Sequence, residues 1–425
     1  MINKYNKKDY HLKIYSISII ILFISYIIGF VFGENATGGK IDHQYIKEII
    51  EGFTQNFKDY FQNYQNRHSP VFYILISFFK KINLSIESIR FFHFCLSLTL
   101  IYCFYKCLEI KFEKLNKIIL LAISSLILLS PNFRTLSIWP QPIILATIFF
   151  VISIYFFLKF QKSENKNEKF KYALINNVLL IISAYISPNF SIFIIYFFYH
   201  YFLYFNLRKK ILYLLLLNIF FSLPAFYYLF GMEKYLNFFY SVYSAQSPNY
   251  SGLAFNLSNK ILIICSIIFF HLIPFIVTKS FKISFDFYKK NILMSLVIFI
   301  LFLFFAFTFN FQVNYGGGGI FFTVSNYLFN NNILFYLCSF VALMTIFQIS
   351  YKNFNNFLLF LVLVLLNHQL SIYHKYYDPL IIILVFTIFS SKINMTYLNR
   401  KKNIFFIGSY SLFFLILNFT KHYLN

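Results

Sequence analysis

Charged residues are scarce in this chain of 425 residues: they make up 12% of it, and only 14 are acidic. A soluble domain carries about a quarter charged residues, so the chain has about half of the charge that a water-facing surface needs. Apolar residues make up 59% of it. This composition excludes a soluble enzyme, a coiled coil and a disordered chain, and it indicates a membrane protein with many spans.

Cysteine, proline and glycine are also few, with 5, 9 and 12 residues. All five cysteines lie in apolar stretches and none forms a C-x-x-C pair, so no disulfide framework is predicted. Cys103 and Cys107 lie one helical turn apart, a spacing that could suit a metal, but no His, Asp or third Cys joins them. We interpret them as small apolar fillers.

Positive charge is in excess, with 37 Lys and Arg and a net charge of +23. In a soluble protein this excess would suggest a nucleic-acid partner. In a membrane protein, basic residues collect in the cytoplasmic loops. We therefore predict no nucleic-acid partner.

Thirteen apolar stretches are long enough to be read as spans. They are 14–33, 89–106, 118–133, 142–159, 172–187, 190–207, 211–230, 261–279, 291–309, 333–350, 355–371, 379–391 and 404–420. The predicted fold class is an all-α polytopic membrane protein, with residues 1–425 forming one transmembrane domain.

The connections between these stretches alternate in charge. With the N-terminus in the cytoplasm, the cytoplasmic segments hold 25 of the 37 basic residues and six of the 14 acids, so their net charge is +19 against +4 outside. This asymmetry supports the thirteen spans, because one missed span would move every later loop to the other side and remove the difference in charge. No A-x-A site follows the first stretch, so we expect an anchor rather than a signal peptide. A bacterial inner membrane is the expected location.

The first outer segment, 34–88, is the longest one and forms the first periplasmic loop in this topology. Residues 43–52 have the apolar spacing of an amphipathic helix, with Asp42 at the N-cap position before it. Residues 70–79 are apolar but too short to span, which predicts a second helix in the membrane interface, with Pro70 in its first turn.

This order resembles the opening of the GT-C glycosyltransferases, including the mannosyltransferase-like and aminoarabinose-transferase-like enzymes. Asp42 follows the first span, an amphipathic helix comes next, and His68-Ser69-Pro70 leads into an apolar segment. The stretch 130–160 is similar to the family's second outer loop and following helix, and 172–207 to its next hairpin. Residues 373–379, YHKYYDP, resemble a loop that precedes a late span.

The resemblance implies an inverting membrane glycosyltransferase. Such an enzyme moves a sugar from a polyprenyl-phosphate donor to a lipid, glycan or protein acceptor on the outer face. Asp42 would be the general base that takes the proton of the acceptor hydroxyl. Cationic side chains would stabilise the lipid phosphate that leaves. The residues expected to bind substrate and lipid phosphate are Lys40, His43, Arg67, His68, Arg134, Lys375 and Asp378.

One departure concerns metal binding. Many relatives carry a second acid in the second outer loop, whereas 131–141 has none and Arg134 stands there with Trp139 and Gln141. We therefore predict neither a metal site nor an obligate cofactor, although a divalent metal is conceivable.

Each candidate also has a plain structural interpretation. Asp42 could be a helix cap only, and Asp378 could cap the span at 379–391. His43 and His68 could be hydrated residues at the interface. The run Gly316–Gly319 could form a phosphate nest, but a flexible loop is the better interpretation.

Two other functions compete with the transferase. A polysaccharide polymerase or ligase also has many spans, but such enzymes usually carry their large loop late in the chain. A flippase for lipid-linked glycans, or another transporter, should show paired repeats and broken or charged helices near the midplane. No convincing repeat is found, and the charges lie at loops and interfaces.

Overall fold

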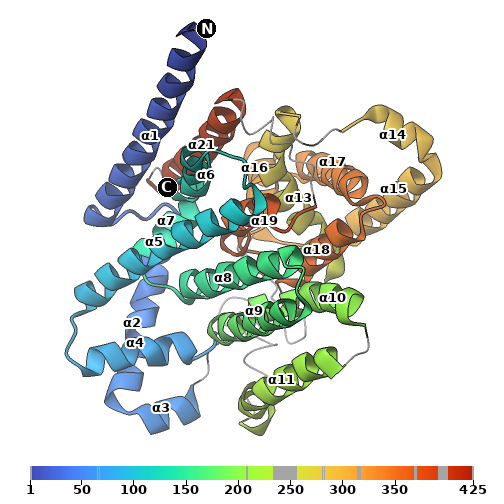
Figure 1. The fold of residues 1–425 in the computed structure, drawn as a ribbon. Helices are drawn as coiled ribbons and strands as arrows, with labels where there is room; N and C mark the ends of the chain where they lie inside the picture. Colours follow the sequence, from blue (N-terminus) through green and yellow to red (C-terminus); the bar gives the residue numbers. More distant parts are fainter. Residues whose placement is uncertain are drawn as a thin grey trace. The chain divides into compact units, whose positions relative to one another are not determined.

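The computed structural model describes residues 2–64, 66, 68–206, 209–232, 256–279, 281, 283–313, 317–367, 371–390 and 401–423 (Figure 1). The chain divides into two compact units, which are described separately: Met1–Ser241 with Met395–Asn425, and Val242–Asn394. The single domain expected over 1–425 stays a prediction.

Helices build both units. The first unit contains α1 (Ile2–Val31), α2 (Gly39–Gln55), α3 (Phe57–Asn63), α4 (Val71–Lys81), α5 (Ile86–Lys111), α6 (Lys117–Ser125), η1 (Leu126–Leu129), α7 (Pro131–Ile138), α8 (Pro142–Lys162), α9 (Lys166–Ile186), η2 (Pro188–Ile192), α10 (Phe193–Phe205), α11 (Lys209–Phe226), η3 (Tyr227–Gly231) and α21 (Lys401–Tyr423). The second contains α13 (Leu257–Val277), α14 (Phe285–Lys290), α15 (Ile292–Phe307), α16 (Gly319–Phe329), α17 (Ile333–Ser350), α18 (Phe354–Leu365), η5 (His374–Tyr376) and α19 (Leu380–Phe386). The described residues contain no strand, so the all-α class is confirmed.

Long apolar helices support the membrane assignment. Within the described ranges, eight helices are long and apolar enough to cross a membrane, and a bent pair, Lys117–Leu129 with Pro131–Ile138, makes up to nine. Each of the thirteen predicted stretches overlaps a helix. However, α10, α15, α18 and α19 have only 13, 16, 12 and 7 residues. The structure therefore fits a polytopic membrane protein and leaves the number of spans open.

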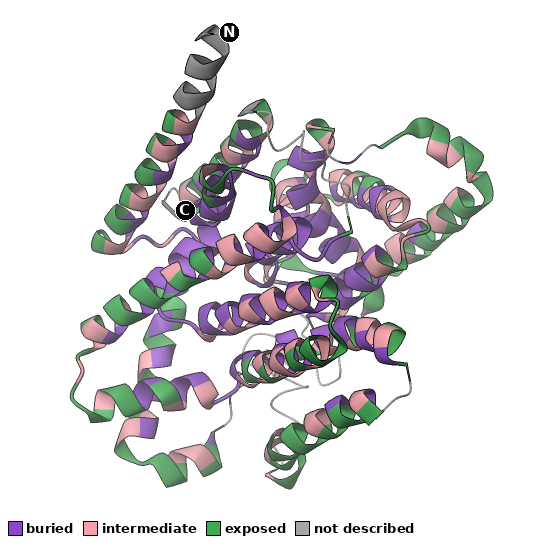
Figure 2. Ribbon diagram, viewed as in Figure 1, coloured by how far each residue is buried: buried purple, intermediate pink, exposed green. Residues whose placement is uncertain are grey.

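The core of the first unit is built around α8, which packs along α9 and against α5. In its apolar window 72% of the residues are buried, against 11% in α11 (Figure 2). Small and polar side chains join α8 to α9: the Ser183 hydroxyl donates to the carbonyl of Ala146 at 2.7 Å, and Asn176 Nδ2 donates to that of Ser153 at 2.7 Å. Such contacts hold helices together where no water competes for the donors.

A sharp bend separates α6 and η1 from α7. The two segments meet at 72°. Ser130 caps α7 by accepting a hydrogen bond from the Phe133 amide at 2.9 Å, and Pro131 occupies the first turn, where it needs no amide hydrogen. Ser130 and Pro131 begin a new helix within the segment 131–141 that was predicted as the second outer loop, so only 139–141 remain as an irregular connection before α8. The side of the membrane on which this segment lies stays a prediction.

The first outer loop contains three short helices. The amphipathic helix predicted at 43–52 is α2, and the second interfacial helix is α4, which packs against α2. An ion pair of 3.0 Å between Lys80 and Glu51 joins them. Pro70 is the N-cap residue of α4 rather than part of its first turn. The intervening α3 was not predicted.

The second unit packs around α13, which contacts α15, α16 and α17. In its apolar window 72% of the residues are buried. Gly317, Gly318 and Gly319 have φ of 88°, 85° and 77°, a region that side chains disfavour. The Gly318 amide donates to the carbonyl of Ile372 at 3.0 Å. The described part of the glycine run thus brings two backbones together.

Candidate functional site

The first outer loop begins at a buried ion pair. Glu34 lies three residues beyond α1, and its side chain and that of Arg134 are 5% and 4% exposed. Arg134 Nε donates to Glu34 Oε1 at 2.7 Å, and Nη2 donates to Oε2. The other N–H groups donate to Leu128 O and Ser25 Oγ, both at 3.3 Å, and to Ser25 O at 3.0 Å.

These contacts use all five donors of the guanidinium group. In this arrangement Arg134 has none left for a lipid phosphate, although it was a candidate for that role. The pair instead fixes the start of the first outer loop against α7, across 100 residues of sequence. The sequence interpretation of Arg134 as a lone basic residue missed its partner, because that partner lies in a different loop.

Trp139 lies where the first loop, α5 and α7 meet. Its indole N–H donates to the Glu34 carbonyl at 2.9 Å. The Arg90 guanidinium lies 4.3 Å from the ring centroid and Lys40 Nζ lies 5.6 Å from it, both within the range of cation–π attraction. Arg90 also donates to the Ile138 carbonyl at 3.0 Å. Neither Trp139 nor Arg90 was a sequence candidate, although Trp139 is the chain's only tryptophan.

Asp42 lies in the first turn of α2 rather than at its N-cap. The N-cap residue is Gly38, with φ of 78°. The cap interpretation of Asp42 was therefore wrong: the helix begins several residues earlier, so Asp42 is already inside it. The side chain is exposed, and a carboxylate in the first helical turn is stabilised by the helix dipole.

A buried amide orients this exposed carboxylate. Gln141 Nε2 donates to Asp42 Oδ2 at 3.0 Å, and Gln141 is 5% exposed. Pro142 follows Gln141 and begins α8, which explains the extended backbone of Gln141, at φ −138° and ψ 149°. The start of α8 thereby directs the side-chain amide of Gln141 toward Asp42 on α2. Gln141 is part of the site, yet sequence reasoning did not single it out.

The start of α2 is held close to α7. A Cβ at Gly39 would lie 2.6 Å from the Thr135 methyl carbon, so a larger residue at this position would require the Thr135 side chain or the backbone to shift. Lys40 is exposed, and its amide donates to Asn35 Oδ1 at 3.0 Å. The loop therefore places one cationic and one anionic residue in the first turn of α2. We call Lys40, Asp42 and Gln141 the first-loop site.

His43 follows Asp42 but points into the protein. It is 3% exposed, and neither ring nitrogen has a hydrogen-bond partner within the described part of the chain. Burial, assisted by the charge of Lys47, lowers the pKa of His43 to about 4, and the nearby Pro140 carbonyl opposes this shift. The expectation of a hydrated histidine was wrong, and a neutral imidazole offers no positive charge to a phosphate at pH 7.

The turn that contains His68 lies at the C-terminal end of α9. Tyr64 donates to the His68 carbonyl at 3.1 Å, and the Ser69 hydroxyl donates to that of Tyr185. This end of α9 is the end that packs beside the start of α8, where Gln141 holds Asp42. The turn and the first-loop site thus share one end of the α8–α9 pair. The candidate Arg67 lies outside the described residues.

The remaining two candidates belong to the second unit. Asp378 is 2% exposed, and its amide donates to the His374 carbonyl at 3.0 Å. The N-cap residue of α19 is Pro379, so the interpretation of Asp378 as that cap was wrong. Lys375 Nζ lies 5.2 Å from the centroid of the Tyr373 ring. The structure places neither residue relative to Asp42.

Among the residues that the structure describes, no three His, Cys, Asp or Glu side chains come together to hold a metal ion. The first-loop site itself offers one carboxylate, one amide and one ammonium group, which suit the recognition of hydroxyl and phosphate groups better than metal ligation.

Comparison with protein-family models, with curated proteins and with solved structures finds no match to this chain.

Proposed function

We propose that this chain is an inverting membrane glycosyltransferase of the GT-C type, which uses a polyprenyl-phosphate sugar as donor. The acceptor would be a lipid, a glycan or a protein on the outer, periplasmic face of a bacterial inner membrane. In this proposal all thirteen predicted stretches cross the membrane, including the short helices and the bent pair, and the N-terminus is cytoplasmic.

The observation that carries the proposal is the first-loop site. Asp42 is an exposed carboxylate on an interfacial helix directly after the first span, and Gln141 from the second outer segment orients it at 3.0 Å. A general base needs such a combination, since it must reach the substrate and also keep one orientation.

The proposed reaction exchanges one bond for another at the anomeric carbon. The acceptor oxygen attacks that carbon while Asp42 takes the hydroxyl proton, and the bond from the carbon to the phosphate oxygen breaks. The electron pair leaves with the polyprenyl phosphate. Lys40 is the described cation on the same helical turn, and it would stabilise the charge on the leaving phosphate. The phosphate is already a good leaving group, so no obligate metal is needed, and EDTA should leave turnover unchanged.

The decisive experiment compares variants of the purified protein in nanodiscs. Each is incubated with radiolabelled polyprenyl-phosphate sugars and a membrane-lipid extract as acceptor. Loss of a general base costs about 10²- to 10⁴-fold in rate, so we expect Asp42→Asn to lose transfer and donor hydrolysis by about that factor. Gln141→Ala should lose about threefold to tenfold, since one hydrogen bond to the carboxylate is removed.

The matched control is Glu48→Gln, which neutralises another exposed acid of α2 and should stay within about twofold of wild type. Full activity of Asp42→Asn would contradict the proposed base. If no donor is turned over and carrier lipid is instead translocated in proteoliposomes, the protein is a flippase and the proposal fails.

A further inference from the structure

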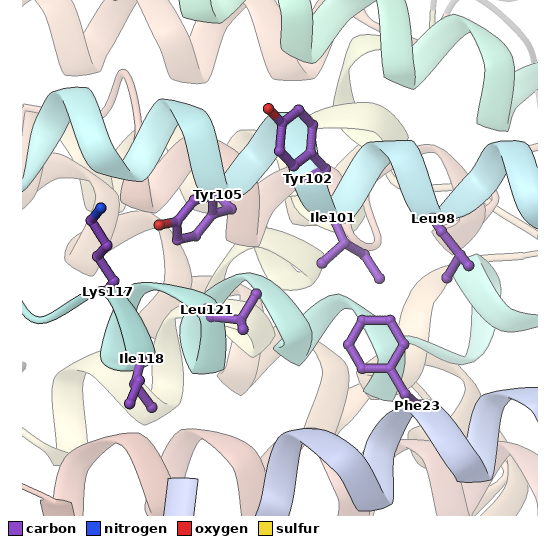
Figure 3. A pocket seen from close by; sticks show the side chains of 8 residues that line it. All are labelled: Phe23, Leu98, Ile101, Tyr102, Tyr105, Lys117, Ile118 and Leu121. Atoms are coloured by element: carbon purple, nitrogen blue, oxygen red, sulfur yellow. The ribbon is translucent and has the colours of Figure 1, made fainter. Parts of the chain in front are cut away.

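A groove lies between α1, α5 and α6, outside the first-loop site. Its volume is about 340 Å³ (Figure 3). It is lined by Phe23, Leu98, Ile101, Tyr102, Tyr105, Lys117, Ile118 and Leu121. Ile101 is 3% exposed and Tyr102 is 61% exposed, so the groove runs from the packed interior to the outer surface of these helices.

The two ends of the groove differ in chemistry. The ammonium group of Lys117 and the hydroxyl of Tyr105 lie at one end, and Phe23 and Leu98 lie at the other (Figure 3). Except for Lys117 and the two tyrosine hydroxyls, every lining side chain is apolar. The groove therefore suits an elongated apolar molecule with an anionic group at one end.

The charges around Lys117 leave a positive excess. Glu109 accepts a hydrogen bond from Tyr105 at 2.6 Å and forms an ion pair with Lys106 at 2.7 Å. The pair with Lys106 neutralises this carboxylate, and Glu113, the other acid of the segment, pairs with Lys162. Lys117 is then the cation that lines the groove. An anion at this end would meet net attraction rather than repulsion.

The groove is separate from the first-loop site along α5. Arg90 of that helix contacts Trp139, whereas the groove begins at Leu98 and extends to Tyr105. The seven steps from Leu98 to Tyr105 cover roughly 10 Å of helix. The predicted topology puts Lys117 at the cytoplasmic boundary, so the groove would open to the inner leaflet, which carries anionic lipid.

We propose that this groove binds one acyl chain of an anionic phospholipid, with the lipid phosphate at Lys117. Both α1 and α5 are long apolar helices, so the surface around the groove faces hydrocarbon. Lipid is then the most abundant apolar molecule that can enter it. The single cation at one end selects an anionic headgroup over a zwitterionic one and fixes the direction of the chain.

Native mass spectrometry of the purified protein in detergent tests this proposal. Phosphatidylglycerol and phosphatidylcholine with the same acyl chains are titrated separately, and bound lipid is counted. We expect one phosphatidylglycerol to bind more tightly than phosphatidylcholine. Lys117→Gln should weaken its binding about fivefold, the size expected for one lysine at an anionic surface. Lys114→Gln is the matched control, since this exposed lysine does not line the groove, and it should change binding less than twofold.

A second variant tests the apolar part of the site. Leu121→Trp fills the groove and should abolish the tight phosphatidylglycerol site while the thermal unfolding temperature stays within a few degrees of wild type. A phosphatidylglycerol with a photoreactive acyl chain should label peptides that contain Leu98–Tyr105 or Leu121. The proposal would be overturned if both lipids bound equally or if Lys114→Gln weakened binding as much as Lys117→Gln. It would also be overturned if Leu121→Trp still bound the lipid or if the photoreactive lipid labelled other peptides. A protein dimer that covers the groove in place of bound lipid would overturn it as well.

Discussion

At the scale of single residues, the buried ion pair between Glu34 and Arg134 is a contact whose loss should strongly lower the stability of the protein. Both side chains are almost fully buried, and Arg134 uses all its donors on the protein. Removing one partner leaves an uncompensated buried charge, which costs about 3–5 kcal/mol. We therefore expect Arg134→Ala to lower the free energy of unfolding by about that amount, measured by thermal unfolding in detergent.

The control for this prediction is Lys58→Ala, which removes an exposed lysine of the same loop and should change stability by less than about 0.5 kcal/mol. A stable Arg134→Ala protein that has lost only donor binding would contradict the structural role. It would return Arg134 to the phosphate-binding candidates.

His43 predicts a dependence of stability on pH. Its pKa in the folded protein is about 4, below the ordinary value of 6.5, because the ring is buried. The unfolded chain therefore binds a proton that the folded protein rejects, and the stability contributed by this residue is complete above pH 6.5 and is lost as the pH falls toward 4. The loss amounts to about 3 kcal/mol at most.

The measurement compares wild type with His43→Phe, which keeps a ring beside Trp139 and cannot titrate. Wild type should lose more thermal stability between pH 7.5 and pH 5 than the variant does, while other buried histidines contribute equally to both proteins. Parallel pH profiles of the two proteins would show that His43 does not titrate in this range.

The sequence predicted part of the site and missed its partners. Asp42 and Lys40 could be placed after the first span because both lie in one short segment. Glu34 and Arg134 could not be paired, since their contact spans 100 residues and depends on the bend before α7. The burial of His43 did have a signal, because it lies three and seven residues before Ile46 and Ile50, on the apolar face of α2.

At the scale of elements, the glycines before α16 join two segments of the second unit. Gly317 has φ of 88°, and a Cβ on it would lie 2.2 Å from the Ile372 carbonyl oxygen. We expect Gly317→Ala to lower the free energy of unfolding by about 2 kcal/mol, since both strain and a backbone clash oppose it. Thermal unfolding of the purified protein measures the change.

Gly408→Ala is the matched control for this substitution. The nearest atom to its Cβ, Leu126 Cδ2, lies 3.6 Å away, so the added methyl group makes an ordinary contact in a helix. Its effect should be neutral or stabilising by up to about 1 kcal/mol. A harmless Gly317→Ala would mean that this part of the glycine run is a flexible loop, as its composition suggested.

The apolar pattern located the helices well and their bends poorly. Every predicted stretch overlaps a helix, because long apolar runs have few alternatives in a membrane. The helix after the bend at Ser130-Pro131 was missed because α7 is much less apolar than α6 and η1, so its polar residues predicted a loop. Its signal was present nevertheless, as a capping serine before a proline. The short α3 has no strong apolar period, so the pattern could not find it.

At the scale of the whole molecule, the distribution of lysine and arginine predicts which face each loop occupies. In a cysteine-free background, we expect a cysteine in place of Glu48 to react with a membrane-impermeant maleimide in intact spheroplasts. A cysteine in place of Glu164 should react only after the membrane is opened. Both side chains are exposed, so burial does not limit the reaction. The opposite pattern would put the first-loop site in the cytoplasm and exclude the proposed outer-face reaction.

A cysteine in place of Lys421 tests the number of spans, which the helix lengths alone leave open. If all thirteen predicted stretches cross, twelve of them lie between Glu48 and Lys421. An even number returns the chain to the same face, so this cysteine should also react in intact spheroplasts. Labelling only after opening would mean an odd number. One of the short helices α10, α15, α18 and α19, or the bent pair before α8, would then enter the membrane without crossing it. The bent pair is the first to examine, because its two segments meet at 72° and α7 holds the first-loop site.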